Sequence, residues 1–197
     1  MKSKNILIMA LITAVAGMAS ANLVLNGDFE DGTTGWNHSW GVWREYNGET
    51  ESHMMVFENG GGGDIDLRSD LFAVSAGLTL HYSFNSGIWQ ETSPGDAPTF
   101  QIRFFNELGD AEGGFVGEVW VDILRTENDW GTLSTLNTGM ATAPEDAAYA
   151  DVVFRAGWPH GWEGGFRIDN VSVVPEPATL ALLGLGSLGL LRRKRAA

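Results

Sequence analysis

Hydrophobic and polar residues alternate with a period of two along much of the chain. This spacing is typical of β-strands that bury one face and expose the other. The clearest alternation is in residues 78–84, 100–104 and 148–154. Shorter runs predict further strands at residues 23–25, 40–46, 53–57, 71–74, 115–123 and 166–174. Because segments rich in Gly, Asp and Asn separate these short strands, the pattern predicts an all-β protein folded as a two-sheet antiparallel sandwich.

The last of these runs contains a break in its alternation. Its large apolar residues have even numbers before Asp169 and odd numbers after Asn170. If all of them are buried, one extra residue must be accommodated at this point, as in a β-bulge. A bulge re-aims the side chains beside it, so we expect Asp169 to point at something other than bulk water.

Both ends of the chain have the composition of addressing segments. The first contains Lys2 and Lys4, an apolar run at 6–16 and the sequence Ala-Ser-Ala at 19–21. This order predicts a cleaved signal peptide, although an uncleaved N-terminal membrane anchor shares its first two features. Near the other end, an apolar run of 14 residues precedes a cluster of four basic residues. As a helix this run is shorter than the ~20 residues that span a bilayer. The basic cluster prefers the cytoplasmic side of the membrane, so the middle of the chain would lie on the outside.

The middle segment, residues 22–174, is strongly acidic. Its 24 acidic residues, set against six arginines and no lysine, leave 18 net negative charges. This charge disfavours binding to nucleic acid or anionic lipid headgroups. It is compatible with neutral ligands and divalent cations, and equally with solubility alone. The chain has no cysteine, so the domain must be stabilised by its core, by a metal ion, or by both.

The C-terminal segment resembles a PEP-CTERM sorting signal. It reads VPEPATLALLGLGSLGLLRRKRAA, with Pro175, Glu176 and Pro177 first, then a short apolar helix, then a basic cluster that begins with Arg192 and Arg193. The resemblance implies a Gram-negative bacterium in which a membrane protease of the exosortase type recognises the signal. It also implies a destination in the cell envelope, at the cell surface or in the extracellular matrix, with at least transient anchoring in the inner membrane.

Both ends of the middle segment resemble galactose-binding-like jelly rolls, a group that includes several carbohydrate-binding modules. The matching sequences are NLVLNGDFEDGTTGW at 22–36 and FRIDNVSVV at 166–174. The resemblance implies a two-sheet jelly roll whose first and last strands lie side by side. It also implies a structural Ca²⁺ near this seam, held by Glu30 and Asp169 with help from Asp28. Carboxylates are ligands that calcium prefers; in the alternative interpretation these residues are ordinary turn and surface acids.

Eight tryptophans are a large number for this chain. We predict that Trp36 lies in the core behind the first loop, and that three others lie in strands as core or sheet-face residues: Trp40, Trp43 and Trp120. Indole rings stack on the apolar faces of sugars while nearby polar groups bind the hydroxyls. The candidate glycan-binding residues are those in Gly- and Pro-rich connections: Trp89, Trp158, His160 and Trp162. Alternatively, the indoles fold back and close the ends of the sandwich.

Motifs of metalloproteases, serine hydrolases and cysteine proteases do not occur in the sequence. The four histidines lack the H-E-x-x-H spacing, and there is neither a G-x-S-x-G motif nor a cysteine nucleophile. Carboxylates abound, but no pair stands out as the acid and base of a glycosidase. We therefore predict an exported, non-catalytic protein with a signal peptide at 1–21, a carbohydrate-binding sandwich at 22–174 and a sorting segment at 175–197. The alternatives are a structural or adhesive matrix protein without a small ligand and, third, a small glycan-acting hydrolase.

Overall fold

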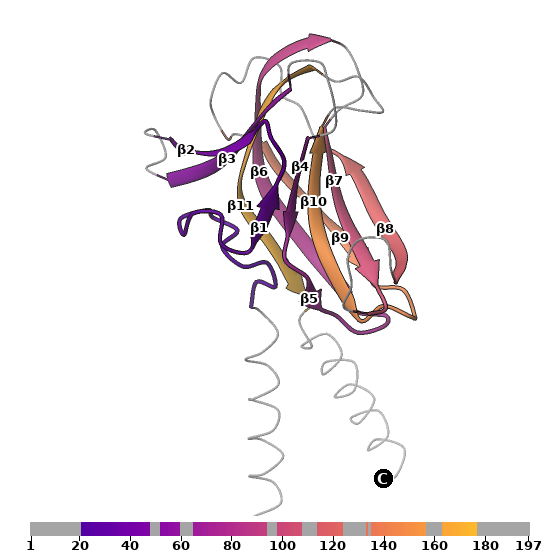
Figure 1. Cartoon of the computed structure of the whole chain (residues 1–197). Coiled ribbons are helices and arrows are strands. Elements are labelled where there is room, and N and C mark those ends of the chain that lie inside the picture. Colours follow the sequence, from indigo (N-terminus) through magenta and orange to yellow (C-terminus); the bar gives the residue numbers. More distant parts are fainter. Residues whose placement is uncertain are drawn as a thin grey trace, which may run out of the picture.

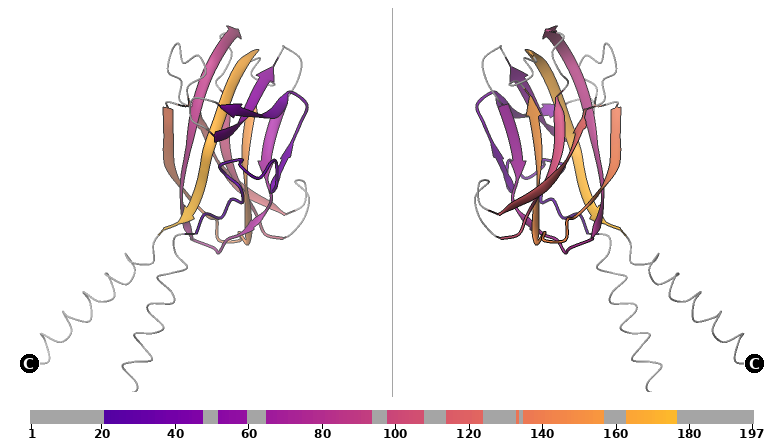
Figure 2. Two further views of the ribbon diagram at one scale, coloured as in Figure 1. Left: turned by 90° about the vertical axis from the view of Figure 1, so that its left-hand side faces the viewer. Right: turned by 90° about the vertical axis from the view of Figure 1, so that its right-hand side faces the viewer.

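The computed structural model describes eleven β-strands in two antiparallel sheets that face each other (Figure 1, Figure 2). The described residues are 21–47, 52–59, 65–93, 98–107, 114–123, 133, 135–156 and 163–176. Every described element is a strand, so the predicted all-β antiparallel sandwich is confirmed. Within these ranges, no helix is long and apolar enough to cross a membrane.

The strands are divided between two sheets of similar size. Sheet A has the order β1 (Trp36–His38), β4 (Ile65–Ser69), β10 (Tyr149–Ala156), β7 (Thr99–Phe105) and β8 (Phe115–Asp122), and the short strand β5 (Phe72–Ala73) also pairs with β10. Sheet B has the order β2 (Val42–Asn47), β3 (Ser52–Asn59), β11 (Glu163–Pro175), β6 (Thr79–Ser93) and β9 (Thr135–Thr142). The last strand of the chain therefore lies in the centre of its sheet.

The core between the sheets is built by the alternating apolar residues of the sequence. Phe84 of β6 contacts Phe154 of β10 edge to face, with 5.0 Å between the ring centroids. Phe100 of β7 lies 4.9 Å from Phe84 and 5.2 Å from Phe154, and all three rings are fully buried. Trp36 joins this cluster 6.3 Å from Phe154 and is buried, as predicted. These aromatic contacts tie sheet A to sheet B.

The opening segment of the domain lies along β11, as the jelly-roll resemblance implies. The backbone N–H of Leu23 donates to the carbonyl oxygen of Val173 at 2.8 Å. The side chain of Asn22 donates to the Val171 carbonyl at 2.9 Å and accepts from the Val173 N–H at 2.8 Å. The prediction of a strand at residues 23–25 is wrong, because Leu23 makes one backbone bond to β11 and the side chain of Asn22 makes the other two.

The predicted β-bulge in the last strand is confirmed. The pairing of β11 with β6 shifts in register between Asp169 and Ser172, and Asn170 has a φ of 53°. Asparagine adopts this left-handed conformation more readily than most residues. The apolar residues on both sides of the shift are buried, so the bulge keeps both halves of the strand facing the core.

The sequence pattern misses three strands and also misplaces Trp89. Strands β1, β4 and β9 are not predicted, because β1 is only three residues long and β4 begins one residue after a glycine run. Strand β9 reads TLNTGMAT and turns mostly small and polar residues toward the sandwich. Trp89 lies within β6 rather than in a connection, because β6 continues along β11 as far as Ser93.

The two ends of the described chain lie at the same end of the sandwich. In Figure 1 the first described residues, in indigo, and the last, in yellow, both reach the lower end of the sheets. At this end the Glu176 N–H donates to the Thr79 carbonyl at 2.8 Å, so the fold holds the chain up to the start of the tail. Segments attached at either terminus therefore leave from one pole.

Candidate functional site

The outer face of sheet A carries a set of polar side chains that are almost fully buried. Phe100, Ile102 and Phe104 of β7 face the core, so Gln101 and Arg103 face outward. Both are nevertheless buried, at 2% and 8% exposure. Buried polar groups are costly unless they are hydrogen-bonded, and they are seldom placed on a sheet surface without a role. This face is therefore the strongest candidate for a functional site among the described residues.

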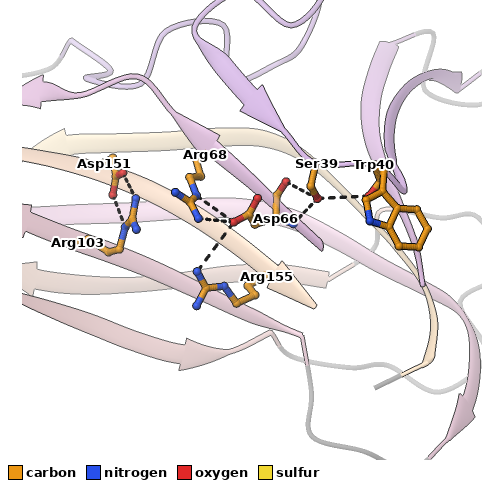
Figure 3. Close-up of polar contacts among 7 residues, drawn as sticks. All are labelled: Ser39, Trp40, Asp66, Arg68, Arg103, Asp151 and Arg155. Carbon is orange, nitrogen blue, oxygen red and sulfur yellow. Dashed lines mark hydrogen bonds and ion pairs between the residues drawn. The ribbon is translucent and has the colours of Figure 1, made fainter. Parts of the chain in front are cut away.

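Arg103 and Asp151 form a buried ion pair in the middle of this face (Figure 3). They are directly opposite each other in the pairing of β7 with β10. Arg103 Nε donates to Asp151 Oδ1 at 2.9 Å, and Arg103 Nη2 donates to Asp151 Oδ2. Because both carboxylate oxygens receive a bond, the pair holds its two side chains in one orientation.

A second cluster lies further along the face and is centred on Asp66 (Figure 3). Asp66 Oδ2 accepts from Arg68 Nε at 3.0 Å and from Arg68 Nη2 at 2.6 Å. Arg155, opposite Asp66 in the pairing of β10 with β4, places its Nη2 4.0 Å from the same oxygen. The Ser39 hydroxyl accepts from the Asp66 N–H at 2.8 Å and fixes the end of β4. Two guanidinium groups thus share one carboxylate.

Two buried donors on this face have no hydrogen-bond partner among the described residues. They are Thr99 Oγ1 and Arg155 Nε. Thr99 and Arg155 are directly opposite each other in the pairing of β10 with β7. A buried donor without an acceptor is destabilising by about 1–3 kcal/mol, so this pair of groups is suited to bind an oxygen atom of a ligand or of water.

Exposed aromatic side chains border the polar residues. Trp120 of β8, opposite Gln101, is 46% exposed, and Phe115 at the start of the same strand is also exposed. Trp40 is 68% exposed and lies beside the Ser39–Asp66 end of the face (Figure 3). Trp120 is a sheet-face residue, as expected. Trp40 is not, because it lies in the turn between β1 and β2 and not in the strand predicted from residue 40. Aromatic surfaces next to oriented polar groups are suited to bind sugars.

The residues predicted to bind a glycan from loops are not placed by the structure. Trp158, His160 and Trp162 lie outside the described residues. The backbone of Trp89 belongs to β6, but its side chain lies outside the described part of the chain. Their role stays a prediction.

The acids predicted to bind calcium lie near the seam between the opening segment and β11. Asp169 is 2% exposed, and its burial raises its pKa to about 6. Hydrogen bonds from the Asn170 N–H at 2.6 Å and the Ser52 hydroxyl at 3.2 Å act in the opposite direction. The negative charges of Glu30 and Asp28 raise the pKa of Asp169 further.

The carboxylate of Glu30 is hydrogen-bonded to His53 of strand β3. Its Oε1 accepts from the His53 N–H at 2.6 Å, and its Oε2 lies 2.8 Å from His53 Nδ1. The backbone hydrogen bond from His53 is the main cause that lowers the pKa of Glu30. Arg44 donates to the backbone carbonyls of Phe29 and Glu30 at 2.6 and 2.8 Å. In the described ranges, no three acidic or histidine side chains are close enough together to hold a metal ion.

The C-terminal segment matches a known sorting motif. Residues 173–195 match the PEP-CTERM protein-sorting motif, which includes the predicted signal residues Pro175, Glu176, Pro177, Arg192 and Arg193. Of these, Pro175 ends β11 and Glu176 follows it, and the others lie outside the described residues. The motif implies an exported protein handled by the exosortase system of Gram-negative bacteria. A comparison of the sequence with curated proteins gives no match.

Solved structures share the fold at low sequence identity. The enzymatically active domain of bacteriophage CBA120 tailspike protein 4 aligns with a TM-score of 0.59 and 18% identity, over 79% of this chain and 21% of that one. The CBM22-1–GH10 modules of Clostridium thermocellum xylanase 10B, complexed with xylohexaose, align at 0.52 and 14%, over 80% and 29%. TmCBM61, in complex with β-1,4-galactotriose, aligns at 0.48 and 13%, over 80% and 100%. This chain spans less than a third of the first two structures, and the predicted jelly-roll sandwich is confirmed.

Proposed function

We propose that this protein binds carbohydrate without cleaving it, and that the binding site is the outer face of sheet A. The observation that carries the proposal is the set of buried, oriented polar groups on that face, bordered by exposed tryptophans. Sugar rings present apolar C–H faces to indoles and hydroxyl groups to such polar side chains. The fold is shared with proteins whose solved structures hold xylohexaose and β-1,4-galactotriose, which supports the same ligand class.

The proposed site has the features of a binding surface rather than of a catalytic one. Its two best-placed carboxylates, Asp66 and Asp151, each accept hydrogen bonds from an arginine, so neither is free to contact a glycosidic bond. A glycosidase needs one carboxyl that is protonated near neutral pH and a second that is free. We therefore place the protein among non-catalytic carbohydrate-binding proteins. Release of reducing sugar from a polysaccharide would instead identify it as a hydrolase.

The sorting motif and the position of the two termini support display outside the inner membrane. The first and last described residues both lie at the lower end of the sandwich in Figure 1. A domain tethered at that end projects the rest of the sandwich away from its point of attachment. The loop residues Trp89, Trp158, His160 and Trp162 belong to this proposal as additional glycan contacts.

Replacing Trp120 with alanine should weaken glycan binding by about tenfold to 30-fold, the effect of removing an aromatic anchor. The measurement is titration calorimetry of the full-length protein with a polysaccharide selected on a glycan array. Trp43→Ala is the matched control, because Trp43 is 38% exposed and lies on sheet B. Equal losses in the two variants would contradict the proposed face. A protein that binds no glycan would instead support the structural or adhesive matrix role.

We also propose that a Ca²⁺ ion binds at the seam, with Asp169, Glu30 and Asp28 among its ligands. A buried carboxylate beside two further acids has unfavourable electrostatic energy that a divalent cation relieves. Calcium takes six to eight oxygen ligands and accepts backbone carbonyls, so it needs fewer side chains than the transition metals do. For Glu30 to join the site, its carboxylate must turn from His53 toward Asp169.

The calcium proposal predicts that Asp169→Asn changes the melting temperature in opposite directions with and without calcium. Because the pKa of Asp169 is about 6 in the folded protein and about 3.9 in an unfolded chain, the native state binds more protons between these values. The free energy of unfolding therefore falls as pH rises through this window. In a chelator, Asp169→Asn should raise the melting temperature at pH 7.5 and have no such effect below pH 4. With calcium, the same substitution should lower it.

The measurement is thermal unfolding of the full-length protein at the two pH values, in chelator and in millimolar calcium. Glu176→Gln is a control, because Glu176 is a carboxylate that follows the end of β11, away from Asp169 in the middle of that strand. A wild-type melting temperature that is identical in chelator and in calcium at pH 7.5 would rule out the cation without affecting the fold.

A further inference from the structure

We infer that the outer face of sheet A selects acidic polysaccharides, and that Arg155 is the residue that binds the sugar carboxylate. This inference rests on the proposed function, and it specifies the ligand class for the same face. The structural basis is a guanidinium group that the protein itself leaves without a sufficient partner, next to a second donor in the same condition.

The arginines of the domain are concentrated on this face. Residues 22–174 contain six arginines and no lysine, and three of the six lie here: Arg68, Arg103 and Arg155. Asp151 accepts bonds from Arg103 with both carboxylate oxygens, so that pair is internally neutral. Asp66 is the remaining acid in the middle of the face, and it stands between two arginines. One positive charge is therefore in excess around Asp66.

Arg155 is the arginine that carries this excess. Arg68 already donates to Asp66 Oδ2 with two of its nitrogens, whereas Arg155 Nη2 lies 4.0 Å from that oxygen, beyond hydrogen-bond distance. Arg155 Nε is buried and has no acceptor among the residues that the structure describes. A partly desolvated guanidinium binds a planar carboxylate more strongly than any neutral oxygen, because both charge and geometry match.

Thr99 completes the recognition site from the neighbouring strand. Its hydroxyl is buried and also lacks a partner within the described ranges. Residues directly opposite on antiparallel strands have Cβ atoms about 4.5–5.5 Å apart, and Thr99 is directly opposite Arg155. A carboxylate has two oxygens, so it can accept from Arg155 Nε with one and from the Thr99 hydroxyl with the other. A sugar hydroxyl can accept from the same donors, but it carries no charge to pair with the guanidinium.

The remaining charges on the face limit where the sugar carboxylate can lie. Asp122 is opposite Thr99 and Glu118 is opposite Arg103, both on the edge strand β8 and both exposed. Exposed charges are screened by water and salt, but they still disfavour an anion on the β8 side. The net charge of the domain is strongly negative, so it offers no general attraction for polyanions. If an acidic polymer binds, the attraction must therefore come from a local interaction with Arg155 and not from the net charge of the domain.

The test compares one polymer with and without its charge. Titration calorimetry of the full-length protein would use polygalacturonate, its methyl-esterified form, and alginate as a second polyuronate. We expect at least one polyuronate to bind, and the acid form of polygalacturonate to bind about tenfold more tightly than the ester, as for a hydrogen bond to a charged group. Arg155→Gln should abolish this preference and leave binding of the ester within about twofold.

A second variant should move the preference in the opposite direction. Asp66→Asn removes the carboxylate that competes for Arg155, so the preference for the acid form should increase by a further threefold or more. Equal affinities for acid and ester, or binding of neutral glycans without either polyuronate, would overturn the inference and leave the proposed function intact. A protein that binds no glycan on an array would overturn both.

Discussion

Replacing Asp151 with alanine should lower the free energy of unfolding by about 3–5 kcal/mol, because it leaves a buried arginine without its counter-ion. The side chains of Arg103 and Asp151 are 10% and 7% exposed, so water cannot readily solvate the guanidinium that remains. Glu118, opposite Arg103 on β8, is exposed and too well solvated to replace Asp151 fully. Denaturant unfolding of the full-length protein, followed by tryptophan fluorescence, measures the loss.

The paired variant Arg103→Met with Asp151→Leu is the control for this interpretation. Replacing both partners of a buried ion pair by apolar residues is often neutral or stabilising, so the double variant should be within about 1 kcal/mol of wild type. It should at the same time lose affinity for glycans if the pair orients sugar hydroxyls. A single variant Asp151→Ala that costs less than about 1 kcal/mol would show that the arginine finds another partner or water.

The fold was largely predictable because the core is built on a period of two. Phe100 and Phe154 stand in runs whose alternation is unambiguous, and they meet Phe84 from the opposite sheet. The bulge before Val171 was predictable for the same reason, since a change of phase between buried residues has few structural solutions. The short strand β1 and the small, polar strand β9 gave no comparable signal.

The candidate site could not be predicted in this way. Alternation indicates that Gln101 and Arg103 face outward, but not that this outer face is buried. Arg103 and Asp151 are 48 residues apart in the sequence, and they meet only because β7 and β10 pair in one particular register. The sequence drew attention to tryptophans in loops, whereas the described site is polar residues on strands with Trp40 and Trp120 at its border. The sequence did contain one signal for this site: the domain has no lysine, and several of its few arginines occupy outward positions of strands.

Replacing Gly27 with alanine should lower the free energy of unfolding by about 3 kcal/mol, the upper end of the usual range for overpacking. A Cβ atom at Gly27 would overlap the backbone carbonyl oxygen of Val171, which no change of side-chain rotamer can relieve. The same carbonyl accepts from the Asn22 side chain, and the Val171 N–H donates to the Gly27 carbonyl at 2.7 Å. The substitution therefore forces apart the seam that joins the opening segment to β11.

Gly32→Ala in the same loop separates steric overlap from backbone strain. Gly32 has a φ of 65°, which alanine adopts at a cost of about 1–2 kcal/mol, but an added Cβ there meets nothing within 4 Å. Gly27 has the opposite properties, since its φ is not in the left-handed region and its surroundings are full. The larger loss should thus occur at Gly27, with a fall in melting temperature of about 6–12 °C for 3 kcal/mol in a domain of this size. If Gly32→Ala were the more damaging substitution, the opening segment would not be packed against Val171, and the jelly-roll seam that positions Asp169 would lose its support.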